Sequence, residues 1–459
     1  MTFQSFEYAV LLLAVFVTYW FLPRRFQNLL LLVVSYVFYS FIDPKMALLL
    51  GGYTAVSYFA ARRIEDDPNN SRKYLWFAIA ASLGALAFFK YAGFFVESVV
   101  DVLDTIGLAN FESTLKIILP IGISFYTFQS IGYVIDVYTK RTHARRSLID
   151  TALFISFFPQ LIAGPIERAS ALLPQFERRR NFDADRTASG ISLLAWGLFK
   201  KLVIADNVGM IVDSIFSTAQ PGAALLWVGV LAFGIQILAD FSGYTYIARG
   251  SARLLGIELS LNFRHPWLAT SPADFWRRWH ITLSSWLRDY VYIPLGGSRN
   301  GRYSNAITLI VTFVLGGVWH GAAWNFVLWG LLHAALILIW RAAVKLKFQV
   351  PTLLATLITF FVISASWLLF REGDLVYIGD NIFDSIGELN LAVALGATAL
   401  IYSLPIWLHA IVDRPHITNI WTRNDVSRTV AFTFLTLTSF IAILALRADT
   451  SAEFIYFRF

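Results

Sequence analysis

The stretch SNAITLIVTFVLGGVWHGAAWNFVLWGLLHAALILIW (304–340) places a histidine between two strongly apolar runs. The runs cover 304–319 and 322–340, and His320 lies between them. About 20 mostly apolar residues are enough to cross a bilayer as a helix. Backbone groups in hydrocarbon must bond internally, which favours helices over other structures. The stretch therefore predicts two membrane helices with an ionisable side chain at or near membrane depth.

The same apolar character extends over the whole chain. Of the 459 residues, 57% are hydrophobic and 15% are charged, whereas soluble domains carry about 25% charged residues. A soluble fold could not bury this much apolar surface, so lipid must be the solvent for much of it. We therefore predict a single all-α membrane domain over 1–459, with about 11 transmembrane helices and additional re-entrant or interfacial helices.

Two features of the composition exclude functional classes. The chain has no cysteine, which excludes disulfides, thiolate catalysis and cysteine-based metal sites. The net charge is +7, but the basic residues occur in short clusters between apolar runs, as in membrane proteins. We therefore expect no nucleic-acid partner.

The first apolar run precedes Arg24 and Arg25 and lacks a basic leader, so it predicts a retained first helix.

Charge also predicts the topology. Basic clusters at 24–25, 62–63, 140–146 and 178–180 are typical of cytoplasmic loops. The acidic segments 97–112 and 372–388 are expected outside, and the arginine-containing segment 413–428 inside. This pattern predicts that both termini are extracytoplasmic.

Two apolar stretches are broken by helix-disrupting residues. The stretches 117–138 and 147–166 contain Pro120, Gly122, Pro159, Gly164 and Pro165. Non-helical backbone at membrane depth is tolerated only inside protein or beside a water-filled cavity. Both stretches are therefore candidates for re-entrant or cavity-lining segments.

The segment SPADFWRRWHITLSSWLRDY (271–290) predicts an amphipathic helix. Ser271 or Asp274 can cap its start, and Pro272 suits its first turn. Its tryptophans share one helical face, while its arginines disfavour a simple spanning helix. One interpretation is an interfacial anchor. The other is that Trp276 and His280, one turn apart, face a reaction chamber.

His320 is the most informative of seven histidines. The others are His143, His265, His280, His333, His409 and His416. An ionisable group at membrane depth is costly and indicates a functional site. Nearby glycines let backbone approach closely, and Asn325 could orient the ring or donate to a developing oxyanion. His333 could assist or only pack against neighbouring helices.

Physical chemistry alone leaves alternatives open at this point. A lone intramembrane histidine can also be an interhelical hydrogen-bonding group. No Gly-x-Ser-x-Gly, His-Glu-x-x-His or phosphate-cradling pattern is present, and the histidine spacing matches no metal signature. A transporter or flippase for a lipid-linked saccharide would also contain a buried polar site, although no inverted repeat is apparent. A scaffold within an envelope complex is a third possibility.

The sequence resembles the membrane-bound O-acyltransferases, in particular the bacterial branch of alginate O-acetylation membrane subunits. The motifs that carry the resemblance run in family order over nearly the whole chain: LPIGISFYTFQSIGYVIDVY (119–138), FFPQLIAGPIER (157–168), ADFSGYTYIARGSARLLGIEL (239–259), NFRHPWLATSPADFWRRWHITLSSWLRDYVYIPLGGSRNG (262–301), LGGVWHGAAWNFVLWGLLH (315–333), FFVISASWLLFRE (360–372) and FIYFRF (454–459). The resemblance implies a membrane fold with helices around a central cavity.

The resemblance also implies residue roles. His320 matches the family's catalytic histidine, and His280 the second histidine of the bacterial branch. Asp240, Ser242 and Tyr244 match a segment that lines the central cavity, and we expect Trp276, Trp319 and Asn325 to line it too. Family members often carry an aspartate two residues after that tyrosine, whereas this chain has Tyr246. Any role tied to that acidic group is therefore in doubt.

The expected reaction follows from these roles. A thioester donor, acetyl-CoA or an acyl carrier protein, would enter from the cytoplasm, and a hydroxyl acceptor would approach His320 from outside. The acceptor would be an extracytoplasmic polysaccharide, reached through a separate periplasmic hydrolase-like acyltransferase. Alginate, cellulose, other exopolysaccharides, peptidoglycan and O-antigen remain open, as does D-alanyl-type transfer. We expect no bound cofactor or metal, and a location in the bacterial inner membrane.

The closing FIYFRF offers two interpretations. Tyr456 could fold back, accept the acyl group on its phenol and pass it on. Alternatively, Phe454, Tyr456, Phe457 and Phe459 could form an interfacial aromatic belt.

Overall fold

The computed structural model describes residues 2–41, 43–107, 118–299, 301–346, 350–413, 425–448 and 452–457. Its regular elements are all helices within these ranges, as the apolar runs predict. His416, most of the predicted inner loop 413–428 and the last two residues lie outside the described part. The chain forms two compact units, residues 1–183 with 252–260 and residues 184–251 with 261–459. The prediction of a single domain stays a prediction.

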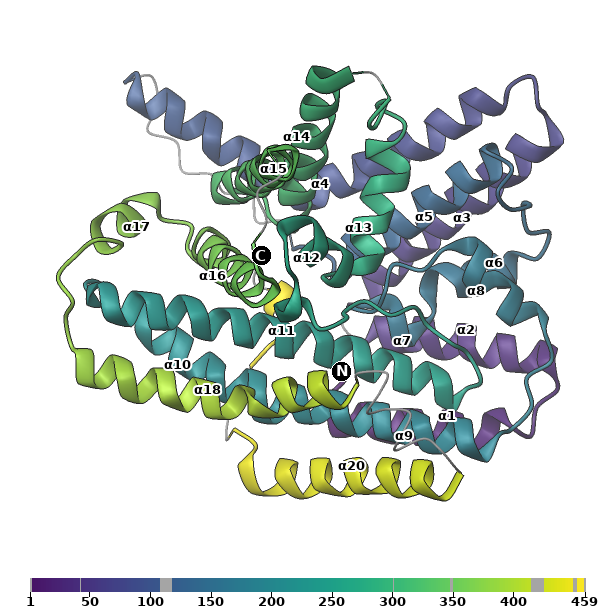
Figure 1. Cartoon of the computed structure of the whole chain (residues 1–459). Coiled ribbons are helices and arrows are strands. Elements are labelled where there is room, and N and C mark those ends of the chain that lie inside the picture. Colours follow the sequence, from purple (N-terminus) through teal and green to yellow (C-terminus); the bar gives the residue numbers. More distant parts are fainter. Residues whose placement is uncertain are drawn as a thin grey trace. The chain divides into compact units, whose positions relative to one another are not determined.

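The first unit contains eight described helices (Figure 1). They are α1 (Phe6–Tyr19), α2 (Arg24–Ser40), α3 (Pro44–Asp66), α4 (Ser71–Thr105), α5 (Ile123–Tyr138), α6 (Leu148–Ser156), α7 (Phe158–Leu161) and α8 (Ala169–Glu177). α3 packs against both α4 and α5. The buried Tyr53 hydroxyl joins these helices, since it donates to Ser82 O at 2.8 Å and accepts from Thr127 Oγ1 at 2.9 Å. Satisfying such buried polar groups makes the packing specific.

The breaks predicted in the two Pro/Gly-containing stretches are confirmed. α6 ends before Phe157 and the four-residue α7 follows, with the Phe158 N–H donating to Ser35 Oγ at 3.0 Å. α5 begins after Gly122, whose φ is 80°. A Cβ at Gly122 would lie 2.5 Å from Leu161 O, so only glycine allows this close approach.

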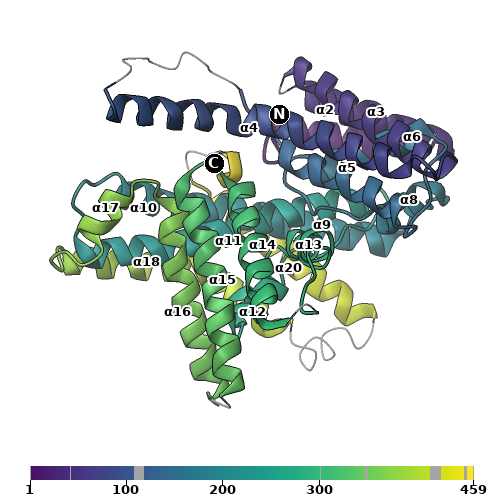
Figure 2. The same ribbon diagram turned by 90° about the horizontal axis from the view of Figure 1, so that it is seen from above.

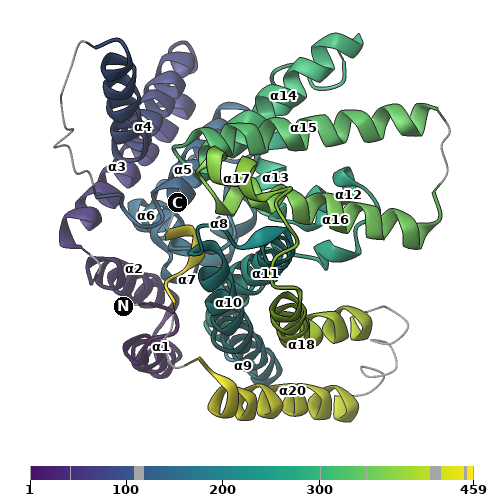
Figure 3. The ribbon, with the colours of Figure 1, turned by 90° about the vertical axis from the view of Figure 1, so that its left-hand side faces the viewer.

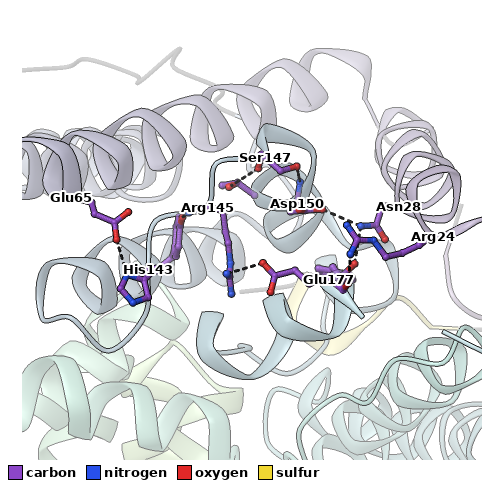
Figure 4. A network of polar contacts seen from close by, with 11 residues as sticks. Arg24, Asn28, Glu65, His143, Arg145, Ser147, Asp150 and Glu177 are labelled. Carbon is purple, nitrogen blue, oxygen red and sulfur yellow. Dashed lines mark hydrogen bonds and ion pairs between the residues drawn. The ribbon is translucent and has the colours of Figure 1, made fainter. Parts of the chain in front are cut away.

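Polar pairs link the helices and loops of this unit (Figure 4). The pairs are Glu65 with His143 at 2.8 Å, Arg145 with Glu177 at 2.8 Å, and Asn28 with Asp150 at 3.0 Å. Arg24 also donates to the Glu177 carbonyl. The His143 side chain is 92% exposed, in keeping with its position in the basic cluster 140–146. An exposed pair such as Glu65 with His143 contributes about 0–1 kcal/mol.

The second unit contains the remaining described elements. They are α9 (Ala184–Phe199), the π-helix η1 (Lys200–Ala205), α10 (Asp206–Phe216), α11 (Gly222–Leu254), η2 (Pro266–Leu268), α12 (Pro272–Arg278), α13 (Ile281–Leu287), the π-helix η3 (Arg288–Tyr292), α14 (Gly301–His320), α15 (Trp324–Lys345), α16 (Thr352–Arg371), α17 (Leu375–Asn381), α18 (Leu389–Val412), α20 (Asp425–Leu446) and η4 (Ile455–Phe457). α20 lies along α9 (Figure 3), where Ser192 Oγ and Thr436 Oγ1 are 2.8 Å apart.

α14, α15 and α16 lie side by side in this unit (Figure 2). Two glycines allow the close approach of α14 and α15. A Cβ at Gly317 would lie 2.1 Å from Phe326 O, and one at Gly330 would lie 2.4 Å from Phe313 O. Such backbone-to-backbone packing through small residues is typical of membrane helices. It fixes the hairpin that carries His320.

Seven helical segments of the described chain are long and apolar enough to cross a membrane. They are Ser71–Thr105, Ala184–Phe216, Gly222–Leu254, Tyr303–His320, Trp324–Lys345, Thr352–Arg371 and Leu389–Val412. Shorter apolar helices occur at Phe6–Tyr19 and Thr433–Leu446. Large apolar side chains on these helices are exposed, such as Leu400 at 61% and Ile401 at 65%. Apolar exposure on this scale suits contact with lipid.

The segment 271–290 differs from the predicted single amphipathic helix. Ser271 caps α12 as expected and accepts from the Asp274 N–H at 3.1 Å. The helix then breaks at His280, whose φ is 42°, and α13 begins at Ile281. The break is stabilised by Asn262, whose carbonyl accepts from the Ile281 N–H and whose Oδ1 accepts from Thr282 N and Oγ1. A helical face is therefore not continuous through this segment, because a tertiary contact outweighs the local periodicity.

Candidate functional site

His320 is the last residue of α14, and only 3% of its surface is exposed. Four aromatic rings surround the imidazole, with centroid distances of 5.0 Å for Trp319, 5.2 Å for Trp329, 5.2 Å for Phe370 and 5.5 Å for Tyr456. The Trp329 indole Nε1 is buried and has no hydrogen-bond partner among the described residues. The site therefore combines a possible base with a buried indole N–H that has no acceptor in the described chain.

A first cavity of about 250 Å³ opens directly onto His320. Trp276 and Trp329 line it near the histidine, and Arg288 and Arg341 also belong to its lining. Most other lining residues are apolar: Leu283, Leu287, Leu309, Phe313 and Gly316 among them. The cavity is suited to a ligand with an apolar end and an anionic end.

A second cavity of about 430 Å³ is lined by Phe370 and by Ile455, the residue before Tyr456. Its polar lining residues are Asp213, Gln236, Asn325 and Arg371. Arg371 pairs with Asp213 at 3.0 Å, and Asn325 Nδ2 donates to Leu369 O at 2.9 Å.

Two amide oxygens in this second cavity are buried without a hydrogen-bond partner in the described chain. They belong to Gln236 and Asn325, whose residues are 7% and 5% exposed. A buried polar atom without a partner is costly. Both residues line the cavity, so their amide groups belong to its polar lining.

His280 is fully buried beside the same aromatic cluster. Its Nδ1 is 3.1 Å from Asn262 Oδ1, which can only accept, so Nδ1 carries the proton in this hydrogen bond. Its ring lies 5.8 Å from Trp319 and 4.7 Å from Phe241. Burial lowers the pKa of His280 to about 3, so the ring is neutral at pH 7. The structure thus brings both predicted histidines into contact with Trp319.

The three predicted residues of α11 have different surroundings. Asp240 forms an ion pair with Lys201 at 3.0 Å and accepts from the Ile455 N–H at 2.7 Å. The Tyr244 ring lies 4.2 Å from that of Phe454. These two residues therefore contact the C-terminal segment, which runs beside α11 and α16 (Figure 1).

Ser242 faces a separate small cavity. Its hydroxyl accepts from Lys200 Nζ at 3.0 Å and donates to Leu238 O at 2.5 Å. The Lys200 ammonium also lies 4.5 Å from the centroid of the Tyr246 ring. Tyr246 therefore gives this lysine a cation–π contact at the position where family members often have a carboxylate.

Trp276 lines the first cavity, and a hydrogen bond to His333 fixes the orientation of its side chain. Its indole N–H donates to His333 Nδ1 at 3.3 Å, so a neutral His333 carries its proton on Nε2, which lies 3.1 Å from Ser366 Oγ. Ser366 in turn donates to Ile363 O at 2.6 Å. His333 thus joins α12, α15 and α16, which favours the helix-packing role over a chemical one.

Sequence reasoning did not single out several residues of the site. They are Lys201, which bonds to the C-terminal segment, and Gln236, Arg288, Trp329 and Arg341, which line the two cavities. Two adjacent lysines inside the apolar run 188–218 were a usable signal, because charges at membrane depth are costly. No comparable signal marked Trp329 among 15 tryptophans.

Comparison with known proteins shows consistent similarity. A family model described as "MBOAT, membrane-bound O-acyltransferase family" matches residues 142–370. A probable alginate O-acetylase AlgI of Pseudomonas putida is 35% identical over the full length of both chains. A probable alginate O-acetylase AlgI of Pseudomonas aeruginosa is 40% identical, covering 82% of this chain and 73% of that protein. A peptidoglycan O-acetyltransferase of Helicobacter pylori is 38% identical, covering 76% and 72% respectively.

Proposed function

Because the chain belongs to the membrane-bound O-acyltransferase family, we propose that it moves an acetyl group from a cytoplasmic thioester to an extracytoplasmic polysaccharide, with His320 as general base. The chain is a multi-pass membrane protein and an O-acyltransferase. The position of His320 supports this proposed direction of transfer and its general base. It lines one cavity and contacts Phe370, which lines the other.

The first cavity suits the donor. Acetyl-CoA and acyl carrier proteins both present a thioester on a phosphate-bearing pantetheine arm. Arg341 and Arg288, of which the second also pairs with Asp289, line the cavity and can contact an anionic group. The predicted topology puts the chain after Arg341 in the cytoplasm, where such donors occur. The bacterial inner membrane is the location that fits this donor and an outer acceptor.

The chemistry needs one base and one oxyanion donor. The attacking hydroxyl oxygen bonds to the thioester carbonyl carbon while its proton moves to the His320 imidazole. The Trp329 indole N–H, which has no acceptor in the described chain, is the proposed hydrogen-bond donor to the resulting oxyanion. Collapse of the tetrahedral intermediate breaks the carbon–sulfur bond, and the imidazolium returns the proton to the leaving thiolate. Acyl, and not the donor, thus crosses the membrane.

The second cavity suits a hydroxyl-bearing acceptor, since the Gln236 and Asn325 oxygens can accept hydrogen bonds from hydroxyl groups. Three similar proteins are named for O-acetylation of alginate or peptidoglycan. An acidic or amino-sugar polysaccharide outside the membrane is therefore the proposed final acceptor, reached through a separate periplasmic hydrolase-like acyltransferase.

The acyl group reaches that acceptor through Tyr456 in this proposal. The Tyr456 ring is 5.5 Å from His320, and its hydroxyl oxygen is buried. Burial raises the pKa of the Tyr456 phenol above its usual value near 10, so a neighbouring base is needed to remove its proton. Phe454 is fully buried, which favours this arrangement over an aromatic belt in the lipid interface.

The decisive experiment replaces His320 with alanine and measures transfer of radiolabelled acetyl from acetyl-CoA in vesicles that contain the polymer-modifying system. The proposal expects a loss of about 10²–10⁴-fold with a normal protein level, the range for removal of a general base. His143→Ala provides the matched control, because it removes an exposed imidazole. Retained acetyl transfer in His320→Ala would refute the catalytic role and leave the transporter and scaffold interpretations.

A further inference from the structure

The π-helix η1 begins with two adjacent lysines, Lys200 and Lys201, and both are buried. Neighbouring side chains of an α-helix point about 100° apart, so two adjacent side chains are rarely buried by the same neighbours. Lys200 is 5% exposed and Lys201 is 1% exposed. The wider π-helical turn over Lys200–Ala205 redirects the two side chains to different neighbours. Such π-helical turns occur frequently at functional sites. Lys200 contacts Ser242 and Tyr246, as described above, whereas Lys201 points toward the C-terminal segment.

Lys201 binds the C-terminal segment and also pairs with two carboxylates. Its Nζ lies 2.8 Å from Asp206 Oδ1 and 3.0 Å from Asp240 Oδ1, and it donates to Ala452 O at 2.8 Å. The second oxygen of Asp240 accepts from the Ile455 N–H at 2.7 Å. One buried ion pair therefore makes two hydrogen bonds to the backbone of the C-terminal segment. Charge-assisted bonds of this kind are among the stronger ones in proteins.

The described part of the segment has little regular secondary structure of its own. Its only described regular structure is the three-residue turn η4, which is too short to be stable alone. Phe454 packs on Tyr244 at 4.2 Å and on Phe241 at 5.7 Å, but its ring contacts do not fix the direction of the backbone. Tyr456 lies beyond these anchors and contacts His320.

We infer that Lys201 and Asp240 are positioning residues that latch residues 452–457 into the reaction chamber, so that Tyr456 is presented to His320. Asp206 pairs with the Lys201 ammonium and holds it in place. The latch is a property of the fold. Its effect on turnover rests on the proposed function, because only an acyl-accepting Tyr456 makes the position of the segment limit the reaction.

A thiol-accessibility experiment tests the latch without any catalytic readout. The chain contains no cysteine, so Ile455→Cys introduces the sole thiol at a position that is 4% exposed. The full-length protein in detergent is treated with a charged maleimide, and the labelling rate is followed by mass spectrometry. Asp240→Asn and Lys201→Met, each combined with Ile455→Cys, are expected to raise the rate at least tenfold.

Two controls make the result specific. Glu453→Cys places the thiol on the same segment at an exposed position, and its rate should not change in either background. The paired replacement Lys201→Met with Asp240→Leu is made together with Asp206→Asn, so that no buried carboxylate is left without its ammonium partner. Proteins often tolerate the removal of all members of a buried ionic group, but this variant also loses both bonds to the segment. The latch therefore predicts fast labelling of Ile455→Cys in this combination too, at an unchanged melting temperature.

The outcomes are distinct. An unchanged labelling rate in Asp240→Asn and Lys201→Met would overturn the latch. Slow labelling restored in the paired replacement would also overturn it, because the two residues would then serve only charge balance. Fast labelling together with unimpaired acetyl transfer would support the latch and refute the role of Tyr456 in the proposed function.

Discussion

His320 and His333 are thirteen residues apart on the α14–α15 hairpin, and both are buried, but their surroundings differ. Both ring nitrogens of His333 have hydrogen-bond partners, Trp276 and Ser366. His320 instead lines a cavity and is surrounded by aromatic rings. Trp329 lies between the two histidines, 5.2 Å from the His320 ring and 4.5 Å from the His333 ring.

The difference shows that burial of a histidine near membrane depth does not by itself indicate chemistry. A ring with both nitrogens engaged by the protein ties helices together. A ring that faces a cavity, next to an indole N–H and a phenol, can act on a ligand. Four substitutions test this distinction: two replace aromatic residues beside His320, one removes an arginine from the cavity that His320 lines, and one replaces His333 itself.

The largest effect is expected from Tyr456→Phe, next to His320. The substitution removes one hydroxyl and keeps the ring, so the aromatic contacts with Phe370 and Phe241 remain. Polymer acetylation should fall by at least about 10³-fold, because a nucleophile that carries the acyl group cannot be replaced by a ring carbon. Acetyl-CoA hydrolysis should continue. Both are measured with radiolabelled acetyl-CoA, as polymer-bound and free acetate.

Tyr377→Phe is the matched control for that variant. Tyr377 donates its hydroxyl to Thr218 O on the surface, outside both cavities. Acetylation of the polymer at the normal rate by Tyr456→Phe would show that the hydroxyl near His320 is not an acyl carrier. His320 would then act directly on the final acceptor.

Trp329→Phe should have the next largest effect. It removes the indole N–H that the described chain leaves without a partner, but retains an aromatic ring between the two histidines. Removal of one oxyanion donor lowers kcat by about 10²–10³-fold, with the KM for acetyl-CoA changed little. Single-turnover acetyl transfer measures the step. A kcat within a factor of three of the unmodified protein would exclude Trp329 as the oxyanion donor.

Much of this region was predictable from the sequence, and the reasons are specific. The flanking apolar runs predict α14 and α15, and the charge cost at membrane depth identifies His320. The close packing at Gly317 also follows from small residues in an apolar helix. The expected roles of His280, Asp240, Ser242 and Tyr244 came from the resemblance to the family. The contact of Asp240 with Ile455 joins residues far apart in the chain, so the spacing of residues in the sequence could not predict it.

The remainder depended on contacts between residues far apart in the chain. The break of the 271–290 helix at His280 requires Asn262, and the role of His333 requires Trp276 and Ser366. No local pattern encodes such pairs, because hydrogen bonds between side chains on different helices are set by packing. The sequence predicts about 11 transmembrane helices, whereas seven helices of the described chain are long and apolar enough to cross a membrane. The number is hard to predict because several apolar segments are short or broken.

Arg341→Ala should have a smaller effect, limited to donor binding. Arg341 lines the first cavity and donates to Asn305 Oδ1 at 2.7 Å, so its guanidinium is held at the position proposed for a donor phosphate. The KM for acetyl-CoA should rise about tenfold, equivalent to about 1.4 kcal/mol, with kcat unchanged. The effect should shrink at high salt, because screening weakens exposed charge contacts.

Arg145→Ala is the control for the loss of an arginine, since Arg145 pairs with Glu177 in the first unit. An unchanged KM in Arg341→Ala would place the donor elsewhere. The cavity beside His320 would then have to accept a ligand without an anionic group.

His333→Gln should have the smallest effect on the reaction and a measurable one on stability. Glutamine can still accept from the Trp276 N–H and donate to Ser366, but its flexible side chain fits the two partners less well than the imidazole. One weakened buried hydrogen bond costs about 0.5–1.5 kcal/mol, so the melting temperature should fall while kcat stays within about twofold. Thermal unfolding in detergent and acetyl transfer from the same preparation measure both quantities. Loss of transfer at an unchanged melting temperature would break the contrast between the two histidines, because a ring with both nitrogens bonded to the protein would then be part of the chemistry.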